Sequence, residues 1–486
     1  MKIKILLLCL FVVCAAWAKP IIIKGKINGK LPEALRYNAP VNGSSGFEFC
    51  YTAVVDANGN FEINTDISNV AFIDIYYNYQ PAGYVVAVPG GQYNIDIIKN
   101  GDFITTKVTG TDAPVQQHYN AMLSQIREGL FFETAQQASK IEDPKEFENH
   151  FSQLYKKDFE GITTLYNGKL ISKNIFEALT HERQTFYAAT KSYAILIKHS
   201  TENEATKPNL KPFQDIWEAI FRKEQPGVLQ SPWCGYYLME YKNFKAYQEV
   251  GFNQKNIVNA TDALSGIKHT SGLLPKQYAE CFIAQTLYGY LYGDRKDKGA
   301  ITVFNYLKQH YPKSGYISYF EPKIAPVIAF FAETESLPQG AAYVDNYRQL
   351  NTFEELVKKF EGQKLFIDVW ATWCGPCRDE FKYKDELYKI LKANNVTVLY
   401  ISVDKEDKDE TWKKMIGHYG LQGHHIRVNP ALDLNITKLF NSDGDVNNTG
   451  ILIPWYMLVG SNGTVHQLHA ASPSDISKLE AEIKKM

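Results

Sequence analysis

The segment FIDVWATWCGPC, residues 366–377, decides the fold of the C-terminal part of this chain. Its first half, residues 366–371, is a short apolar run with the composition of a buried strand. Its second half carries Cys374 and Cys377 with Gly-Pro between them, a spacing that places both thiols in the first turn of a following helix. Two thiols so placed can close into a small disulfide loop. The segment therefore indicates redox chemistry and not packing alone.

Helices alternate with strands on both sides of this segment. We expect helices over 352–360, 374–393, 411–419, 434–440 and 475–485, buried strands over 364–371 and 396–403, and a hairpin of 453–459 with 464–468. This alternation predicts an α/β layer with antiparallel strands added at its end. The turn-rich stretch from Ser336 to Gly340 is expected to be the boundary that precedes it.

The chain ahead of this boundary changes character near residue 110. Short β-rich runs, separated by turns such as Asn28-Gly29 and Asn58-Gly59, predict a small antiparallel sandwich with a structural or docking role. A capping signal at residues 111–114 then opens a mainly helical region, with helices expected over 174–197, 213–223, 276–292 and 300–310. We therefore predict a multidomain chain. It has an N-terminal all-β sandwich (19–110), a central all-α region (111–340) and a C-terminal α/β domain (341–486).

The first 18 residues have the pattern of a secretory signal peptide. Lys2 and Lys4 precede an apolar run over residues 5–13, and Ala16-Trp17-Ala18 offers a cleavage site before Lys19. Cleavage after Ala18 is the prediction. Cys14 raises the alternative of a lipoprotein, in which the lipidated cysteine would attach the chain to a membrane.

Composition and charge exclude some partners. The chain has 52 Lys and Arg against 53 Asp and Glu, and no basic cluster with interleaved aromatics that would follow a phosphate backbone. Nucleic acid is therefore not expected as a partner. Beyond the N-terminal run, no stretch of about 20 apolar residues occurs, so the mature chain is expected to be soluble unless Cys14 is lipidated.

Three cysteines lie outside both the signal peptide and the redox motif. They are Cys50, Cys234 and Cys281, each isolated in an apolar or aromatic context. Such cysteines are expected to be buried and to act as small hydrophobic residues. A bridge between Cys234 and Cys281 remains open, because the sequence does not supply the Cα separation that a disulfide requires.

The wider motif resembles a known family. Residues 366–377 resemble the active-site segment of thioredoxin, and the Ile-Pro pair at 453–454 ahead of a strand resembles its cis-proline site. Residues 378–381, Arg-Asp-Glu-Phe, are similar to the TlpA/ResA-like branch, which comprises exported bacterial thiol-disulfide oxidoreductases. The resemblance covers about 345–486 and is architectural only over the front part. The long stretch 423–450 ahead of the proline departs from the family pattern, so the resemblance does not define the rim of the substrate groove.

The chemistry follows from the cysteines and from this resemblance. A thiolate, and not a thiol, attacks a disulfide, so one cysteine needs a pKa near neutrality. Cys374, at a helix N-terminus, is expected to be the nucleophile, and Cys377, one turn further on, the resolving thiol. By resemblance, Asp368 is a buried carboxylate that relays a proton to or from Cys377, and Glu380 tunes the same thiols.

The resemblance also assigns five residues to substrate binding: Trp373, Gly375, Pro376, Ile453 and Pro454. A cis peptide bond before Pro454 would leave the backbone of Ile453 facing the cysteines, where it can pair with an extended substrate segment. It would also keep a metal-binding side chain away from the dithiol.

Each assignment has a structural alternative. The cysteine pair could be half of a zinc site, although no second pair or Cys/His set at ligand spacing lies nearby. Asp368 could be an ordinary polar residue at a strand end, and the helix dipole alone could favour an acid at Glu380. The remaining polar candidates, expected to be solvated loop residues and not metal ligands, are His418, His424, His425 and Asp443.

The expected function is that of an exported, periplasmic thiol-disulfide oxidoreductase that reduces protein disulfides without a cofactor. The resemblance implies a membrane thiol-disulfide transducer as its electron donor. Gly-Pro between the cysteines resembles reducing thioredoxins. Two alternatives remain: a disulfide oxidase or isomerase on the same fold, and a scaffold protein in which the front domains capture a partner and the redox domain is subsidiary.

Overall fold

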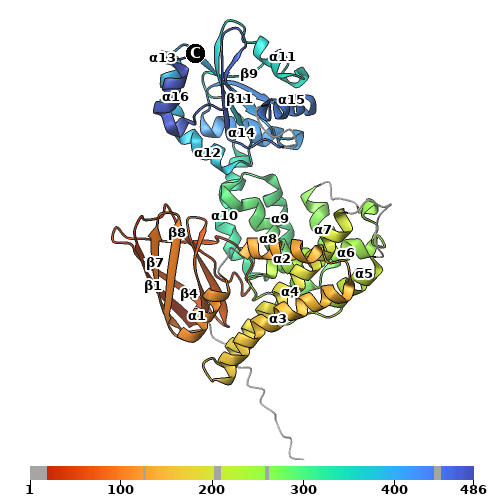
Figure 1. Cartoon of the computed structure of the whole chain (residues 1–486). Helices are drawn as coiled ribbons and strands as arrows, with labels where there is room; N and C mark the ends of the chain where they lie inside the picture. Colours follow the sequence, from red (N-terminus) through yellow and green to blue (C-terminus); the bar gives the residue numbers. More distant parts are fainter. Residues whose placement is uncertain (1–18, 124–126, 202–209, 258–261, 443–449) are drawn as a thin grey trace, which may run out of the picture. The chain divides into compact units, whose positions relative to one another are not determined.

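The computed structural model of the chain describes residues 19–123, 127–201, 210–257, 262–442 and 450–486 (Figure 1). The predicted signal peptide and Asp443 lie outside these residues. Within them, eight strands come first, ten helices follow, and a mixed α/β segment ends the chain. In the same ranges, no helix combines the length and the hydropathy that crossing a bilayer requires.

Two compact units make up the described chain. The first contains the residues up to Tyr288 together with Asn305–Tyr319, and the second contains Gly289–Phe304 and Phe320–Met486. The predicted boundaries at 110 and 340 coincide with changes of secondary structure. Strand β8 (Phe103–Gly110) ends at residue 110, and β9 (Ala341–Tyr343) begins directly after residue 340. The compact units group the residues differently, and the predicted domain ranges remain a proposal.

Two four-stranded sheets open the first unit. Besides β8, their strands are β1 (Lys19–Asn28), β2 (Leu35–Tyr37), β3 (Tyr51–Ala53), β4 (Asn60–Ile67), β5 (Ala71–Tyr77), β6 (Gln80–Ala87) and β7 (Gln92–Asn100). One sheet has the order β4-β1-β7-β8 and the other β3-β2-β5-β6. Alternate residues of both sheets, such as Ile23, Ile73 and Ile95, meet in one core. This period-two burial is what a two-sheet sandwich requires.

The sandwich differs from the prediction in two details. It is not wholly antiparallel, because β1 runs parallel to β7 with Ile23 opposite Tyr93. The chain builds the whole second sheet between these two strands, which is enough length to return in the same direction. The turn at Asn58-Gly59 does not close a long hairpin either. A single bridge joins Val55 to Phe61, and β4 pairs along its length with β1.

Helix α1 (Ala113–Met122) covers the edge of the second sheet. The side-chain amide of Gln116 accepts a hydrogen bond from Val86 N and donates one to Val86 O. Asn120 makes the same pair of bonds with Tyr84. Two side-chain amides thus satisfy backbone groups of the edge strand β6 and block further strand pairing there.

The other helices ahead of the α/β segment are α2 (Arg127–Ser139), α3 (Pro144–Asn167), α4 (Lys173–Thr201), α5 (Lys211–Phe221), α6 (Cys234–Glu249), α7 (Ala263–Leu273), α8 (Lys276–Leu291), α9 (Lys298–His310) and α10 (Gly315–Ala332). The four predicted helices correspond to α4, α5, α8 and α9. Helix α10 was not among the helices named in advance, and it carries Pro322 and Pro326 in its interior. Its buried residues Phe320, Ile324 and Val327 explain why packing maintains it.

The α/β segment is built on a six-stranded sheet with the order β14-β13-β10-β11-β12-β9. Besides β9, its strands are β10 (Lys364–Trp370), β11 (Val396–Ser402), β12 (Gly423–Arg427), β13 (Trp455–Val459) and β14 (Val465–Gln467), and its helices are α11 (Phe353–Lys358), α12 (Gly375–Glu380), α13 (Lys384–Ala393), α14 (Asp409–Tyr419), α15 (Pro430–Phe440) and α16 (Ile476–Ile483). Strand β10 runs parallel to β11 and antiparallel to β13. Figure 1 shows α13 and α16 on one face of this sheet and α11 and α15 on the other.

One prediction for this segment was wrong, and one strand was missed. The single helix expected over 374–393 is divided into α12 and α13 by a 3-10 turn, Phe381–Tyr383, which directs Phe381 into the core against Trp370 and Tyr419. The stretch 423–450, which departs from the family pattern, begins with the unpredicted strand β12 and continues into α15, where a helix was expected over 434–440. A five-residue strand that starts Gly-His-His lacks the apolar alternation by which strands are recognised.

Candidate active site

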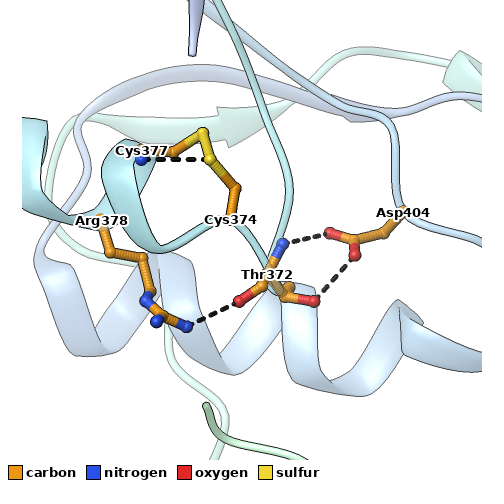
Figure 2. The surroundings of a disulfide bond; sticks show 5 residues. All are labelled: Thr372, Cys374, Cys377, Arg378 and Asp404. Carbon is orange, nitrogen blue, oxygen red and sulfur yellow. Dashed lines mark hydrogen bonds between the residues drawn. A yellow bond between two sulfur atoms is a disulfide. The ribbon is translucent and has the colours of Figure 1, made fainter. Parts of the chain in front are cut away.

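The predicted cysteine pair lies directly after the central strand. Cys374 is the N-cap residue of α12, and it is bonded to Cys377 as a disulfide with a Cα separation of 5.4 Å. The backbone N–H of Cys377 donates a hydrogen bond to Cys374 Sγ at 3.1 Å (Figure 2). After reduction, this donor and the helix N-terminus would stabilise a thiolate on Cys374. Cys374 is also the more exposed of the two, at 4% against 1%.

Thr372 is held from both sides and fixes the loop that leads to the disulfide. Its N–H and its hydroxyl each donate to the Asp404 carboxylate at 2.8 Å, and Ser402 Oγ donates to the same carboxylate. On the other side, the Arg378 guanidinium donates to Thr372 O at 3.0 Å (Figure 2) and to Gly293 O. These contacts keep the loop in one conformation while the disulfide opens and closes.

We predict that Asp404→Ala lowers the free energy of unfolding by about 2 to 4 kcal/mol, because the buried Thr372 N–H and neighbouring hydroxyls lose their acceptor. Burial raises the pKa of Asp404, and the hydrogen bonds from Thr372 and Ser402 oppose this rise. The measurement is thermal unfolding by calorimetry. Asp345→Ala, which removes an exposed carboxylate, is the control, and equal losses in the two variants would contradict the prediction.

Asp368 lies on the face of β10 that carries the disulfide. Phe366 and Trp370, two residues to either side, share a core with both cysteines, and alternate residues of a strand face the same way. Asp368 is buried, and burial first, then the charge of Glu380, raises its pKa well above the usual range. A carboxyl group with a raised pKa keeps its proton to a higher pH than usual and is suited to exchange a proton with a thiol.

Two tyrosines flank this carboxyl group in the sheet. Asp368 is in register with Tyr400 of β11 on one side and with Tyr456 of β13 on the other. Tyr400 shares a 2.9 Å hydrogen bond with Tyr388, whereas Asp368 Oδ1 and the Tyr456 hydroxyl have no hydrogen-bond partner among the described residues. The carboxyl group therefore faces neutral side chains in the sheet, which leaves its proton available.

Glu380, the last residue of α12, has an anchoring role besides its charge. Its carboxylate accepts hydrogen bonds from Ser474 N at 2.9 Å and Ser474 Oγ at 2.8 Å. The two predicted acids are thus both near the site but in different environments. Asp368 is enclosed, and Glu380 is half-buried and tied to the start of the C-terminal helical segment.

The predicted substrate residues differ in exposure. Trp373 is 48% exposed and Pro376 is exposed, although the cysteines beside them are buried. The peptide bond between Ile453 and Pro454 is cis, and Ile453 packs against the core that contains both cysteines. Leu452, just before this pair, is 76% exposed and was not predicted. Gly375 lies between the two cysteines in the sequence and is the first residue of α12.

The histidines were predicted only in part: His418 is exposed as expected but lies in α14, and His424 and His425 lie in a strand. His425 is fully buried in β12, stacks on Tyr400 at 5.0 Å between ring centroids, and hydrogen-bonds Leu421 O through Nε2. Burial lowers its pKa to about 4, so it is neutral. His424 faces the opposite side of the sheet, against Phe360. Over the described ranges, no three His, Cys, Asp or Glu side chains gather to hold a metal ion.

Several residues around the site were missed. Arg378 was used only to identify the family resemblance. No role was predicted for Thr372, Asp404, Tyr400 and Tyr456. The one available signal was Asp404, a carboxylate immediately after the apolar strand β11. Strand register decides which residues flank Asp368, and register is not apparent from a single sequence.

Comparison with known proteins supports this description of the site. A family model described as Redoxin matches residues 347–483. This part of the chain is thioredoxin-like and similar to the ResA proteins. Thiol-disulfide oxidoreductase ResA of Bacillus thuringiensis subsp. konkukian is 31% identical over 98 residues, which are 18% of this chain and 56% of that protein. ResA of Bacillus anthracis is 35% identical over 95 residues, 19% of this chain and 53% of that protein.

The two ResA matches cover less than a fifth of this chain. The chain spans about half the length of the curated relatives it matches. Among solved structures, the thioredoxin domain of a thiol-disulfide oxidoreductase from Bacteroides vulgatus is 20% identical, covers 26% of this chain and 82% of its own, and has a TM-score of 0.21.

Proposed function

We propose that the chain is an exported thiol-disulfide oxidoreductase that reduces protein disulfides by exchange at Cys374 and Cys377. The observation that carries the proposal is a disulfide at a helix N-terminus, on the same face of the sheet as a buried carboxyl group with a raised pKa. The ResA proteins to which the domain is similar are named thiol-disulfide oxidoreductases.

The proposed reaction begins with the reduced chain. The Cys374 thiolate attacks one sulfur of a substrate disulfide and releases the other as a thiolate, which takes up a proton. Cys377 then loses its proton to Asp368 and attacks the mixed disulfide, which releases the second substrate thiol. Two electrons pass to the substrate, and the chain is left with the Cys374–Cys377 disulfide.

Turnover needs an external dithiol, for which we propose a membrane thiol-disulfide transducer. The proposed location is the periplasm, and it depends on the signal peptide with cleavage after Ala18. Sequencing the N-terminus of the mature chain tests this step. A chain that begins at lipidated Cys14 would instead place the enzyme at the membrane surface.

The reduction potential decides between the reductase and an oxidase or isomerase. A value near that of thioredoxin, about −270 mV, fits a reductase, whereas a value near that of DsbA, about −120 mV, would reverse the direction. The potential is measured by equilibrating the purified chain with glutathione buffers and following the Cys374–Cys377 pair by thiol alkylation. Cys50→Ser is the control, since it leaves this pair unchanged.

We predict that Trp373→Ala raises the KM for a protein disulfide about tenfold or less and leaves the reduction of a small aromatic disulfide nearly unchanged. The reason is that an exposed indole beside the nucleophile offers apolar surface to a polypeptide but is not required for exchange. Steady-state kinetics with both substrates provides the measurement. Tyr383→Ala, which removes another exposed aromatic ring of the same domain, is the control. Equal losses with both substrates would contradict a role in binding.

We predict that Glu380→Gln moves the pH dependence of the second exchange step towards lower pH. The negative charge of Glu380 helps to raise the pKa of Asp368, so its removal lets Asp368 ionise at a lower pH. The rate of mixed-disulfide resolution is measured from about pH 5 to 9, with less than a tenfold change expected at neutral pH. Glu386→Gln, at an exposed position in α13, is the control. An unchanged profile would leave Glu380 with its anchoring role only.

A further inference from the structure

A second pair of cysteines lies in the first unit, apart from the residues that match the Redoxin family. Cys234 begins α6 and Cys281 lies within α8, and their sulfurs are 3.8 Å apart. Both residues are buried, at 0% and 1% exposure. The two sulfurs are thus in van der Waals contact as thiols. Closing them to the length of a disulfide, about 2.05 Å, needs a movement of less than about 2 Å.

We propose that Cys234 and Cys281 form a structural disulfide when the chain folds in an oxidising compartment. The proposal is independent of the chemistry at Cys374 and Cys377. Its oxidant is a low-molecular-weight or protein disulfide of the kind found outside the cytosol. Because the folded chain encloses both thiols, the exchange takes place before the helices have closed around them.

The reaction balances in two exchange steps. The thiolate of one cysteine attacks the oxidant disulfide, forms a mixed disulfide and releases the first oxidant thiol. The other cysteine then attacks the mixed disulfide, forms the Cys234–Cys281 bond and releases the second oxidant thiol. Two protein thiols lose two protons and two electrons in all, and one oxidant disulfide becomes two thiols.

The surroundings of the pair indicate what the bond would stabilise. Ser44 Oγ lies 3.5 Å from Cys281 Sγ, and Gln285 Nε2 lies 3.6 Å from Cys234 Sγ. Ser44 also shares a hydrogen bond with Tyr316 of α10. A Cβ atom added at Gly46 would lie 3.4 Å from Cys234 Cβ. The segment that connects β2 to β3 therefore lies directly on the two thiols.

This connecting segment is bound to the turn that precedes α6 and to residues of α8 and α10. Ser45 donates hydrogen bonds to Leu229 O at 2.7 Å and to Gln230 O at 2.9 Å. Phe47 packs against the rings of Tyr288 and Tyr316. A bond between α6 and α8 at this point would join the two helices on which the strand-rich part of the unit is anchored.

Cys50 provides an internal comparison. It is buried as well, but its sulfur lies 3.8 Å from Tyr37 O and 3.6 Å from Ala39 O, carbonyl oxygens of its own part of the unit. The 3.8 Å contact between two sulfurs joins Cys234 and Cys281. Burial alone therefore does not bring a cysteine to the sulfur of another cysteine.

The test counts thiols in a chain that lacks the redox pair. The mature chain with Cys374→Ser and Cys377→Ser is secreted into a bacterial periplasm, unfolded in the presence of an alkylating agent and weighed by mass spectrometry. We expect one alkylated cysteine before reduction and three after it, with Cys234 and Cys281 in one disulfide-linked peptide pair. Three alkylated cysteines before reduction, or a linkage through Cys50, would overturn the proposal.

A stability measurement separates the bond from its side chains. Treatment with dithiothreitol is expected to lower the Tm of the same chain by roughly 5 °C, because reduction removes the cross-link from the unfolded state. The matched variant that also carries Cys234→Ala and Cys281→Ala should show no such shift. An equal shift in both chains, or none in either, would contradict a structural disulfide. Loss of activity at Cys374 would bear on neither measurement.

Discussion

A chain with Cys374→Ser is expected to lose protein-disulfide reduction by at least about a thousandfold, to the level of the reductant alone. A serine hydroxyl does not form the nucleophile that thiol exchange requires, and Cys377, nearly fully enclosed in α12, cannot replace it. The measurement is the reduction of insulin disulfides in the presence of dithiothreitol. Cys50→Ser, which removes another buried thiol, should retain full activity.

The companion variant Cys377→Ser separates the two cysteines. It keeps the proposed nucleophile but cannot resolve the mixed disulfide, so it should trap substrate proteins in covalent complexes that dithiothreitol releases. Complexes that form instead through Cys377 in the Cys374→Ser chain would reverse the assignment. If the chain with both Cys374→Ser and Cys377→Ser rescued a deletion strain, the scaffold alternative would be correct and the redox domain would be subsidiary.

The parts of this site that the sequence predicted are those defined by local spacing. The apolar run ahead of Cys374 is β10, and the Cys-Gly-Pro-Cys spacing closes as the disulfide at the start of α12. The proline after Ile453 follows a cis bond, as expected. Short-range chemistry, such as capping and the conformational restriction of proline, determines these features, and one sequence contains it.

The parts that were missed depend on contacts between distant segments. Asp404 reaches Thr372, 32 residues earlier in the chain, because β11 pairs with β10. His425 looks like a loop residue until β12 is placed at the sheet, where Tyr400 covers its ring. Tertiary packing outweighs local composition in these cases, and the same packing determines which groups surround the buried acid.

The second large effect is expected for Asp368→Asn, which should slow resolution of the mixed disulfide about a hundredfold. An amide has the shape of the carboxyl group but cannot accept the proton of Cys377, and general base catalysis by a positioned group contributes about 10² to 10⁴ in rate. In the wild-type chain, this rate should rise as pH increases through the raised pKa of Asp368. In the variant, that dependence should disappear. Stopped-flow measurement of the resolving step against pH tests both expectations.

The Asp368→Asn substitution should change stability in the opposite sense to activity. Because burial raises the pKa of Asp368 in the folded chain above its unfolded value, its contribution to stability is fully present below the unfolded pKa and is lost as pH rises from there to the raised pKa. Asparagine does not titrate. The variant should therefore gain in Tm relative to the wild type as pH increases, whereas the exposed Asp345→Asn should show no such trend.

The two measurements together identify the role of Asp368. If Asp368 were an ordinary buried polar residue, its substitution would destabilise the fold. The pH–rate profile of the resolving step would then keep its shape. A proton acceptor retained at a cost to stability should show the reverse, with a slower resolving step and a more stable fold at alkaline pH. The flanking Tyr400 and Tyr456 supply no charge that would stabilise the ionised form. The sheet that holds the disulfide therefore makes ionisation of Asp368 unfavourable. An Asp368→Asn chain with both a slower resolving step and a less stable fold at alkaline pH would contradict this account.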